Sequence, residues 1–544
     1  MKCIECGQNF EYFLGEKEAY GRFGYDLPQI CPQCRHLRRL AFRNERRLYY
    51  NKSYLSGKQI IALYPKDSPF KIVDQDEWWG DQFDATLYGR NFDFDRPFFE
   101  QFAELQKEVP RWSRIFLNCE NADFTNNCAE TKNSYLSFSS HSSENLYYCM
   151  RVYRSNDCYD CINVKNGRYS SNCIDCKEIY NTHFSQLSEN CSDSYFLLDC
   201  RACTDCIFCA NLRNKKYMIF NKQYDKEEYE NTKEEFIKQL IADPKAINEK
   251  FEEFKKDKDR RCLYNNNCEN VTGNFINSSK NITNGFLTTS CEDSINIYNC
   301  DETKNSYDTS YNDQSELSLE CDTNFGLYDS CFSSYTVNTK FCRYLDQCFY
   351  LENCFGCIGL KRGKYLILNK QYSQEEYKKM IEKINEHMKH TGEYGKPFPT
   401  YLTSFPYNDT MAYDVSALTK EEVIKKGFTW HEEEKEAGYY AKKCEIPKRE
   451  EDMEESIVNR ILTCEVTGKN YKIVPQEFTF YKKFHLPIPR LCPEQRYKEL
   501  MKLHAPNKLI NTICAICKKE IQTTYPKELN YKILCEDCYL KTVY

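Results

Sequence analysis

The sequence predicts a β-rich multidomain protein: a parallel β-solenoid in two duplicated halves, with helical insertions and a tandem of small ribbons at each end. Three observations predict this fold. Paired Cys-x2-Cys motifs stand near both ends of the 544-residue chain, a long central segment occurs twice, and units of about nine to eleven residues recur within each copy. The content of 43 Tyr and 34 Phe is typical of an ordered chain.

Each end of the chain carries two Cys-x2-Cys pairs. They are Cys3, Cys6, Cys31 and Cys34 near the N-terminus, and Cys514, Cys517, Cys535 and Cys538 near the C-terminus. Two facing pairs supply four thiolates that can converge tetrahedrally on one Zn²⁺, which is the signature of a zinc ribbon. Because all four ligands come from the protein, no coordination position stays open for hydrolysis. The spacing therefore predicts two structural zinc ions.

The two ends are copies of each other. Residues 3–79 align with residues 464–540 without a gap, so each end is a tandem of two ribbons. In each tandem one ribbon has lost ligands: the second ribbon has Ser53, Ser56, Asp74 and Glu77, and the third has Cys464, Thr467, Cys492 and Gln495. Since Ser, Thr and Gln are poor zinc ligands, we expect both of these ribbons to lack zinc, with aromatic packing holding their fold.

The middle of the chain is a second duplication, with residues 119–229 repeated as 268–377. Both copies open on Asn-Cys-Glu-Asn and close on nearly the same segment, KYMIFNKQYDKEEY and KYLILNKQYSQEEY. A unit of nine to eleven residues, such as that from Cys119 to Cys128, is too short to bury one face alone. Stacking such units in a parallel solenoid would bury a shared column of Cys, Tyr and Phe. Two units per coil predict coils of about twenty residues.

The central cysteines allow three interpretations. The favoured one makes them small core residues stacked in ladders. The second is a third zinc site formed by Cys158, Cys161, Cys173 and Cys176. The third is an iron–sulfur cluster on the run of Cys200, Cys203, Cys206 and Cys209, although the second copy has Leu351 in place of one of these four cysteines.

Composition shifts and helical patterns divide the chain into seven segments. These are the N-terminal ribbon tandem 1–80, a helical connector 81–112, the first solenoid half 113–224, a helical insertion 225–262, the second solenoid half 263–372, a helix and connector 373–460, and the C-terminal ribbon tandem 461–544. Asp243-Pro244 predicts that the insertion is a helical hairpin, and Thr419 with Glu422 forms a capping box in the connector.

The sequence contains no phosphate loop, nucleophile elbow, HExxH motif or dinucleotide fingerprint, so it offers no catalytic residue and we do not expect a small-molecule substrate. A carbohydrate-active enzyme stays an alternative, because parallel solenoids can carry pairs of carboxylates. No apolar run is long enough to span a membrane, and the start has no signal-peptide core. We therefore expect a cytoplasmic protein with reduced thiols.

One basic cluster offers an alternative function. Six arginines follow the first zinc knuckle: Arg35, Arg38, Arg39, Arg43, Arg46 and Arg47. Helical spacing would place most of them along one side, where guanidinium groups suit phosphate, so this segment predicts a nucleic-acid-binding helix. The net charge of −6 restricts such binding to a local patch. The competing interpretation is a helix whose arginines are solvated or form ion pairs.

Four motifs carry a family resemblance: CPQCRHLRRLAFRNERRLY at 31–49, NFDFDRPFFEQF at 91–102, LTKEEVIKKGFTW at 418–430 and LPIPRLCPEQR at 486–496. They resemble an uncharacterised family of cysteine-rich, zinc-ribbon-ended proteins of candidate-phyla-radiation bacteria. The resemblance implies zinc and a bacterial cytoplasm, and it implies no activity. In the family the second ribbon tends to keep its cysteines, so this chain departs from the pattern there.

Taken together, these patterns predict a zinc-binding, non-enzymatic scaffold or interaction protein. The predicted solenoid would present an extended surface of stacked turns to a macromolecular partner, either a protein or a nucleic acid, with no role for a membrane. The ribbons at the ends would add a second contact.

Overall fold

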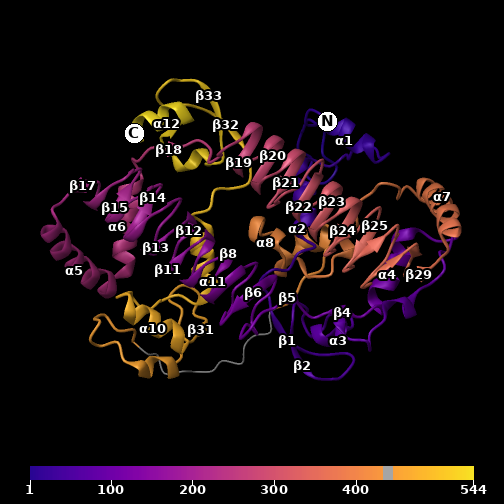
Figure 1. Ribbon diagram of the computed structural model, residues 1–544, viewed down its shortest axis with the longest axis horizontal. Coiled ribbons are helices and arrows are strands. Elements are labelled where there is room, and N and C mark those ends of the chain that lie inside the picture. The colour runs from indigo at the N-terminus through magenta and orange to yellow at the C-terminus, as the bar shows by residue number, and fades with distance from the viewer. Residues whose placement is uncertain (433–444) are drawn as a thin grey trace. The chain divides into compact units, whose positions relative to one another are not determined.

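The computed structural model describes residues 1–432 and 445–544, and these form two compact units. One unit combines Met1–Ile115 with Leu263–Glu432, and the other combines Phe116–Cys262 with Glu433–Tyr544. Each unit therefore contains one terminal tandem and one copy of the central repeat (Figure 1). The N-terminal tandem belongs with the second repeat copy, although the first copy follows it directly in the sequence. We call the two units the N-terminal unit and the C-terminal unit.

The first repeat copy forms a sheet of thirteen strands. They are β5 (Phe116–Leu117), β6 (Cys128–Lys132), β7 (His141–Tyr147), β8 (Met150–Tyr153), β9 (Asn156–Tyr159), β10 (Ile162–Lys165), β11 (Arg168–Ser171), β12 (Ile174–Lys177), β13 (Tyr180–His183), β14 (Ser192–Leu198), β15 (Thr204–Ala210), β16 (Lys216–Ile219) and β17 (Lys222–Gln223). Every pair is parallel except the closing hairpin of β16 and β17.

The second repeat copy forms a seven-stranded parallel sheet followed by short pairs. The sheet contains β19 (Glu269–Asn277), β20 (Lys280–Thr289), β21 (Glu292–Tyr298), β22 (Tyr307–Asp313), β23 (Glu316–Phe325), β24 (Tyr328–Ser334) and β25 (Arg343–Asp346). After it, β26 (Leu351–Glu352) pairs in parallel with β27 (Gly363–Lys364), and β28 (Leu366–Ile367) forms a hairpin with β29 (Lys370–Gln371). The protein is thus β-rich, and its large sheets are mostly parallel.

Within the repeats the parallel pairs have a register of twelve residues, apart from the start of β19, where Glu269 pairs with Lys280 before the register shifts. Ile162 pairs with Met150 on one side and with Ile174 on the other, and Leu319 likewise lies between Tyr307 and Cys331. The sequence predicts coils of about twenty residues, and the pairing corrects that prediction to a period of twelve. The spacings between cysteines misled it because they count three tripeptides, whereas one full period contains four.

The tripeptide is set by the backbone. From Asp160 to Asp175 every third residue has a positive φ of 51–55°. The residue after each of these positions is buried, as Cys161, Val164 and Cys173 show. Asn and Asp tolerate the left-handed region better than other non-glycine residues, which explains their frequency in the repeat. Many of the buried positions that recur every third residue hold small side chains such as Cys and Ser.

Helices flank the repeats as the sequence predicts. Lys226–Ala242 (α5) and Pro244–Lys255 (α6) form the predicted hairpin, which packs Phe236 and Phe251 against Phe208. Gln374–Thr391 (α7) follows the second copy, and Phe98–Glu108 (α4) packs Phe98 against Tyr344. Two short helices, Met411–Val415 (α8) and Lys420–Lys425 (α9), lie in the connector, and α9 has the predicted capping box. None of the helices in the described residues has the length and apolar composition needed to cross a membrane.

The two terminal tandems repeat the same elements. The N-terminal tandem contains α1 (Glu16–Arg22), α2 (Pro32–Leu40), the hairpin of β1 (Tyr49–Lys52) and β2 (Gln59–Ala62), then β3 (Ile72–Val73) and α3 (Gln75–Trp79). The C-terminal tandem contains β30 (Leu462–Thr463), β31 (Asn470–Tyr471), α10 (Pro475–Lys483), α11 (Pro493–Met501), β32 (Ile510–Ile513), β33 (Glu520–Thr523), β34 (Ile533–Leu534) and α12 (Glu536–Val543).

Each tandem also forms a short parallel pair with a strand of the connecting segment in its unit. In the N-terminal unit β3 pairs with β4 (Arg111–Trp112), and in the C-terminal unit β34 pairs with β18 (Arg260–Arg261). In the second ribbon, Trp78 is fully buried and contacts the rings of Trp112 and Phe349. Aromatic packing therefore holds this ribbon, as predicted, although its cysteines are gone.

Candidate metal centres

The N-terminal tetrad is assembled by a turn and a helix. Cys3 and Cys6 flank the first turn, Cys31 is the N-cap residue of α2, and Cys34 lies in its first turn. One sulfur from each of the four cysteines lies within 4.8 Å of the other three. The amide of Cys31 donates to Cys3 Sγ at 3.3 Å, and Gly7 closes the turn with φ of 72°. The structure therefore brings together the predicted first set of ligands.

The C-terminal tetrad has the same construction. Cys535 is the N-cap residue of α12, and its amide donates to Cys514 Sγ at 3.3 Å. The sulfurs of Cys517 and Cys535 are 3.7 Å apart, close to the 3.8 Å between those of Cys6 and Cys31. All four sulfurs again lie within 4.8 Å of one another.

The local electrostatics suit a metal cation at both tetrads. Burial raises the pKa of the Cys3 thiol, but hydrogen bonds from the amides of Cys31, Cys6 and Glu5 outweigh it and lower the pKa to about 6. Backbone amides act in the same way on Cys514, whose pKa is also about 6. A tetrad with one thiolate at neutral pH and a closed tetrahedral donor set fits Zn²⁺. Two cysteine tetrads that can hold metal ions are thus present.

The cysteines proposed for a third zinc lie in the core of the first repeat copy. Cys158, Cys161, Cys173 and Cys176 are all buried, and their sulfurs point to backbone carbonyls, as in the contact of Cys161 Sγ with Tyr159 O at 3.4 Å. Within the part of the chain that the structure describes, only the two terminal tetrads bring three or more metal-ligand atoms within 4.8 Å of one another. The structure does not bring these four cysteines together as a metal site.

The run proposed for an iron–sulfur cluster has the same environment. Cys200, Cys203, Cys206 and Cys209 occupy four successive buried positions, each after a residue with positive φ. Their sulfurs contact the carbonyl oxygens two residues earlier, at 3.3–3.6 Å. Ser185 and Ser188 make the same contact through their hydroxyl groups. These contacts agree with the interpretation of the central cysteines as small core residues.

Hydrogen bonds take the place of metal in the two ribbons that lost ligands. Ser53 Oγ donates to Glu77 and accepts the amide of Asp74 at 3.3 Å, which is the amide that corresponds to Cys535 N in the fourth ribbon. Burial acts to raise the pKa of Glu77, but hydrogen bonds from Ser53 and Ser56 outweigh burial and hold the pKa below its usual value. In the third ribbon, Thr467 Oγ1 lies 3.8 Å from Cys492 Sγ.

The arginine cluster does not form the predicted basic helix. Helix α2 ends at Leu40, so Arg43, Arg46 and Arg47 lie beyond it. Four of the six arginines are between 0 and 6 % exposed and face acidic side chains of their own unit: Arg35, Arg38, Arg39 and Arg43. Arg46 lies 3.6 Å from Asp414, and the amide of Arg47 donates to Asn44 Oδ1. Buried, paired guanidinium groups cannot reach phosphate, so the structure lends the nucleic-acid interpretation no support.

The partners of these arginines are residues that the sequence analysis did not single out. Arg35 Nε donates to Asp308 Oδ1 at 3.0 Å, and Arg38 Nη2 donates to Glu320 Oε1 at 2.7 Å. Both acids belong to strands of the second repeat copy, β22 and β23, at positions with positive φ. One sequence signal for this pairing was available. The ribbon duplication repeats Arg35 as Arg496, and the central duplication repeats Asp308 as Asp160, so both members of the pair occur twice.

Comparison with protein families and with curated proteins finds no match. The family resemblance therefore stays a prediction.

Proposed function

We propose that this chain is a zinc-binding, non-enzymatic scaffold that presents an extended β-solenoid surface to a macromolecular partner. The observation that carries the zinc part is the convergence of four cysteine sulfurs at each end of the chain. Each tetrad fixes the start of one helix: Cys31 and Cys34 belong to α2, and Cys535 and Cys538 belong to α12. The metal would therefore act as a structural clamp, with no open position for substrate.

The repeat geometry supports the solenoid part of the proposal. We expect a coil with four short sides to show a register of twelve residues, found in nearly all of the repeat pairs, and a left-handed residue at every third position. The buried residue in each tripeptide would point into the coil, and the other two would form its outer surface. Stacked coils of this kind have a rigid and regular outer face, which is suited to binding.

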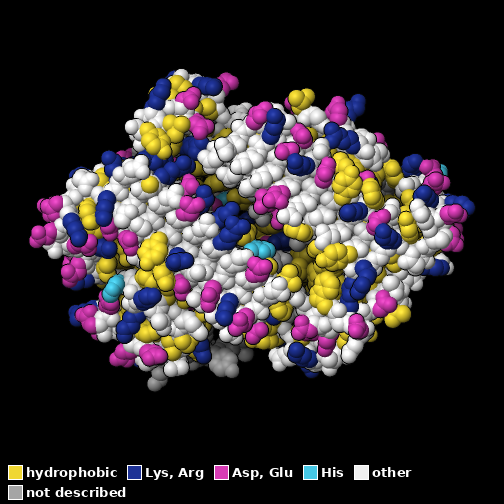
Figure 2. Space-filling view, in the orientation of Figure 1, with side chains coloured by type: hydrophobic (Ala, Val, Ile, Leu, Met, Phe, Trp, Pro, Cys, Tyr) yellow, Lys and Arg dark blue, Asp and Glu magenta, His cyan; other side chains and the backbone are white. Residues whose placement is uncertain are grey.

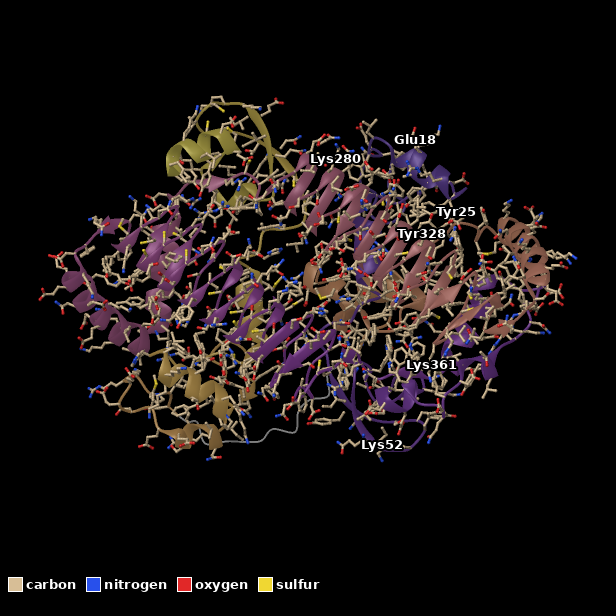
Figure 3. All side chains as sticks on the ribbon, viewed as in Figure 1. Glu18, Tyr25, Lys52, Lys280, Tyr328 and Lys361 are labelled. Atoms are coloured by element: carbon tan, nitrogen blue, oxygen red, sulfur yellow. The ribbon has the colours of Figure 1, made fainter. Side chains whose placement is uncertain are left out.

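That outer face in the N-terminal unit carries an ordered set of side chains. Lys280, Glu292, Lys304 and Glu316 follow one another at the twelve-residue spacing, and Lys304 Nζ lies 3.0 Å from Glu292 Oε2. The same column then reaches Tyr328, which is 38 % exposed (Figure 3). Phe341, 44 % exposed, lies 5.5 Å from Tyr328, ring to ring, and Phe325, 42 % exposed, ends the preceding strand β23. Apolar side chains appear among charged ones on the surface (Figure 2). We propose this aromatic patch as part of the contact surface.

Metal analysis tests the zinc part. Protein produced with zinc is expected to contain two zinc ions per chain by elemental analysis. Cys34→Ser and Cys538→Ser should each remove one of them, whereas Cys492→Ser in the third ribbon is the matched control and should remove none. Fewer than two zinc ions in the intact protein, or a loss of zinc in the control, would contradict the assignment.

Pull-down from native lysate tests the scaffold part. The full chain is expected to retain a protein partner with and without nuclease treatment, and a Phe325→Ser, Tyr328→Ser, Phe341→Ser variant should lose it. Substitution of Lys280 and Lys304 by Ser is a control on the same face. Capture that disappears after nuclease treatment would instead indicate a nucleic-acid partner.

The described cysteines are free thiols, so we place this function in a reducing compartment such as the bacterial cytoplasm.

A further inference from the structure

The two terminal tandems dock on their repeats through the same set of contacts. In the N-terminal unit Asp308 accepts hydrogen bonds from Tyr20 Oη at 2.6 Å and from Arg35 Nε at 3.0 Å. Arg35 also pairs with Glu16 of its own tandem. All four side chains are nearly inaccessible to solvent, so each hydrogen bond here is made in a low-dielectric setting.

The C-terminal unit reproduces this arrangement. Arg496 Nη1 lies 2.6 Å from Asp160 Oδ2 and 2.9 Å from Glu477 Oε1, and Tyr481 Oη lies 3.5 Å from the same Asp160 oxygen. Glu477, Tyr481 and Arg496 correspond to Glu16, Tyr20 and Arg35 in the ribbon alignment, and Asp160 corresponds to Asp308 in the repeat alignment. The shared contacts involve the same residue types in both units, so they do not distinguish one repeat copy from the other.

The pairing in the structure is nevertheless selective. The N-terminal tandem docks on the second repeat copy and leaves the copy that follows it in sequence to the C-terminal tandem. Chain proximity alone favours the opposite choice for the N-terminal tandem, because a short connection costs less loop-closure entropy than a long one. Some interaction outside the shared contacts must discriminate between the two repeat copies.

Three positions beside the shared contacts differ between the units. In the N-terminal unit Arg38 and Arg39 both reach Glu320, at 2.7 and 3.4 Å. The corresponding residues of the C-terminal unit are Glu499, Leu500 and Asn172. The next contact along does not oppose exchange: Arg43 donates to Thr323 and His504 contacts Asp175, and exchange would bring Arg43 to the carboxylate of Asp175.

Exchange of the tandems would be unfavourable at these positions. The C-terminal tandem on the second repeat copy would bring Glu499 against Glu320, two like charges. The N-terminal tandem on the first copy would bury Arg38 against Asn172, without an acid, and would leave Arg39 only the carboxylate of Asp160, the counterpart of Asp308. Leaving a buried charge unpaired is strongly destabilising, and repulsion of wrong partners is a common source of specificity.

We propose that the two repeat copies are alternative docking faces for zinc-ribbon tandems, and that three differing positions select which tandem each face binds. In the N-terminal unit these positions hold Arg38, Arg39 and Glu320. In the C-terminal unit they hold Glu499, Leu500 and Asn172. The partner that such a face accepts is thus a ribbon tandem of matching charge. This selection is independent of the proposed scaffold function, because it concerns the contacts that assemble the chain itself.

Photo-cross-linking in the full chain tests the proposal. Phe23 lies 6.4 Å from Tyr307, ring to ring, so p-benzoylphenylalanine at position 23 should cross-link to the peptide that contains Tyr307. A tandem-exchanged variant carries Arg38→Glu, Arg39→Leu, Glu499→Arg and Leu500→Arg. It is expected to lose this cross-link, or to move it to the peptides that contain Tyr169 or His183, which Phe484, the counterpart of Phe23, contacts in the C-terminal unit.

A compensated variant adds Glu320→Asn and Asn172→Glu to those four substitutions. It is expected to recover the cross-link to the Tyr307 peptide, even though it has more substitutions than the exchanged variant. Recovery excludes simple misfolding as the cause of the loss. An unchanged cross-link in the exchanged variant, or no recovery in the compensated one, would overturn the proposal.

Discussion

Asp308 and Asp160 hold the same position in the two repeat copies, yet their charges are balanced differently. Asp308 faces two guanidinium groups, those of Arg35 and Arg39. Asp160 shares the single guanidinium group of Arg496 with Glu477. Burial acts against ionisation at both sites; the two arginines overcome it and lower the pKa of Asp308 to about 2, whereas the pKa of Asp160 is raised to about 7.

This difference predicts that docking of the C-terminal tandem depends on pH. The pKa of Asp160 in the folded state is above its ordinary value of 3.8, so the folded unit binds more protons than the unfolded one between these values. The contribution of Asp160 to stability is full at low pH and falls by up to about 4 kcal/mol as the pH rises toward 7. Above that pH it does not change further. Hydrogen exchange of α10 and α11 should be faster at pH 8 than at pH 5.5, after correction for intrinsic rates.

The control for the pH effect is Asp160→Asn, which removes the titrating group. We expect this variant to show equal protection of α10 and α11 at both pH values. An unchanged pH dependence of exchange in α10 and α11 of Asp160→Asn would contradict the prediction.

Removing a buried arginine should release its tandem. In Arg35→Ala the carboxylates of Asp308 and Glu16 lose their shared partner, and breaking a buried pair typically costs about 3–5 kcal/mol. All four tryptophans belong to the N-terminal unit, so tryptophan fluorescence during denaturant unfolding reports that unit. Arg96→Ala is the control: its pair with Glu104 is exposed, and we expect a change of at most about 1 kcal/mol.

Zinc removal should weaken docking as well as the ribbon itself. Helix α2 begins at the ligands Cys31 and Cys34 and carries the docking residue Arg35, so the metal and the ion pair stabilise the same turn. A structural zinc supplies on the order of 10 kcal/mol of local folding free energy. Chelation should therefore increase hydrogen exchange both in α2 and in β22, which carries Asp308. A change confined to residues 1–34 would show that the two are not coupled.

The buried positions of the first repeat copy should tolerate serine in place of cysteine, but they should not tolerate a larger side chain. Cys161→Ser is expected to cost less than about 1.5 kcal/mol, because Ser185 occupies the corresponding position two periods later and makes the same carbonyl contact. Gly167→Ala should cost about 1–3 kcal/mol, since the new Cβ would lie 2.7 Å from Val164 Cγ1. Thermal unfolding followed by circular dichroism measures both, and loss of zinc from Cys161→Ser would contradict the core interpretation.

Local patterns were sufficient to predict some features of this protein. The tetrads follow from cysteine spacing because ligands of a ribbon lie in two tight turns, and the α5–α6 hairpin follows from Asp243-Pro244 because capping is local. The three-residue rhythm was within reach of the sequence, since Asn and Asp hold many of the positions with positive φ, but the unequal cysteine spacings masked it and the period of twelve.

The role of the arginines depended on residues far away in the chain. Arg35 and Asp308 are 273 positions apart, and nothing near Arg35 in the sequence distinguishes an arginine that meets phosphate from one that is buried against aspartate. The ribbon spacing and the two duplications can be read from the order of residues along the chain. The ligands of one ribbon turn are also neighbours in sequence, so short-range chemistry is enough to predict them. Which tandem lies on which repeat copy is decided by long-range burial of charge, and only the folded chain brings those charges together.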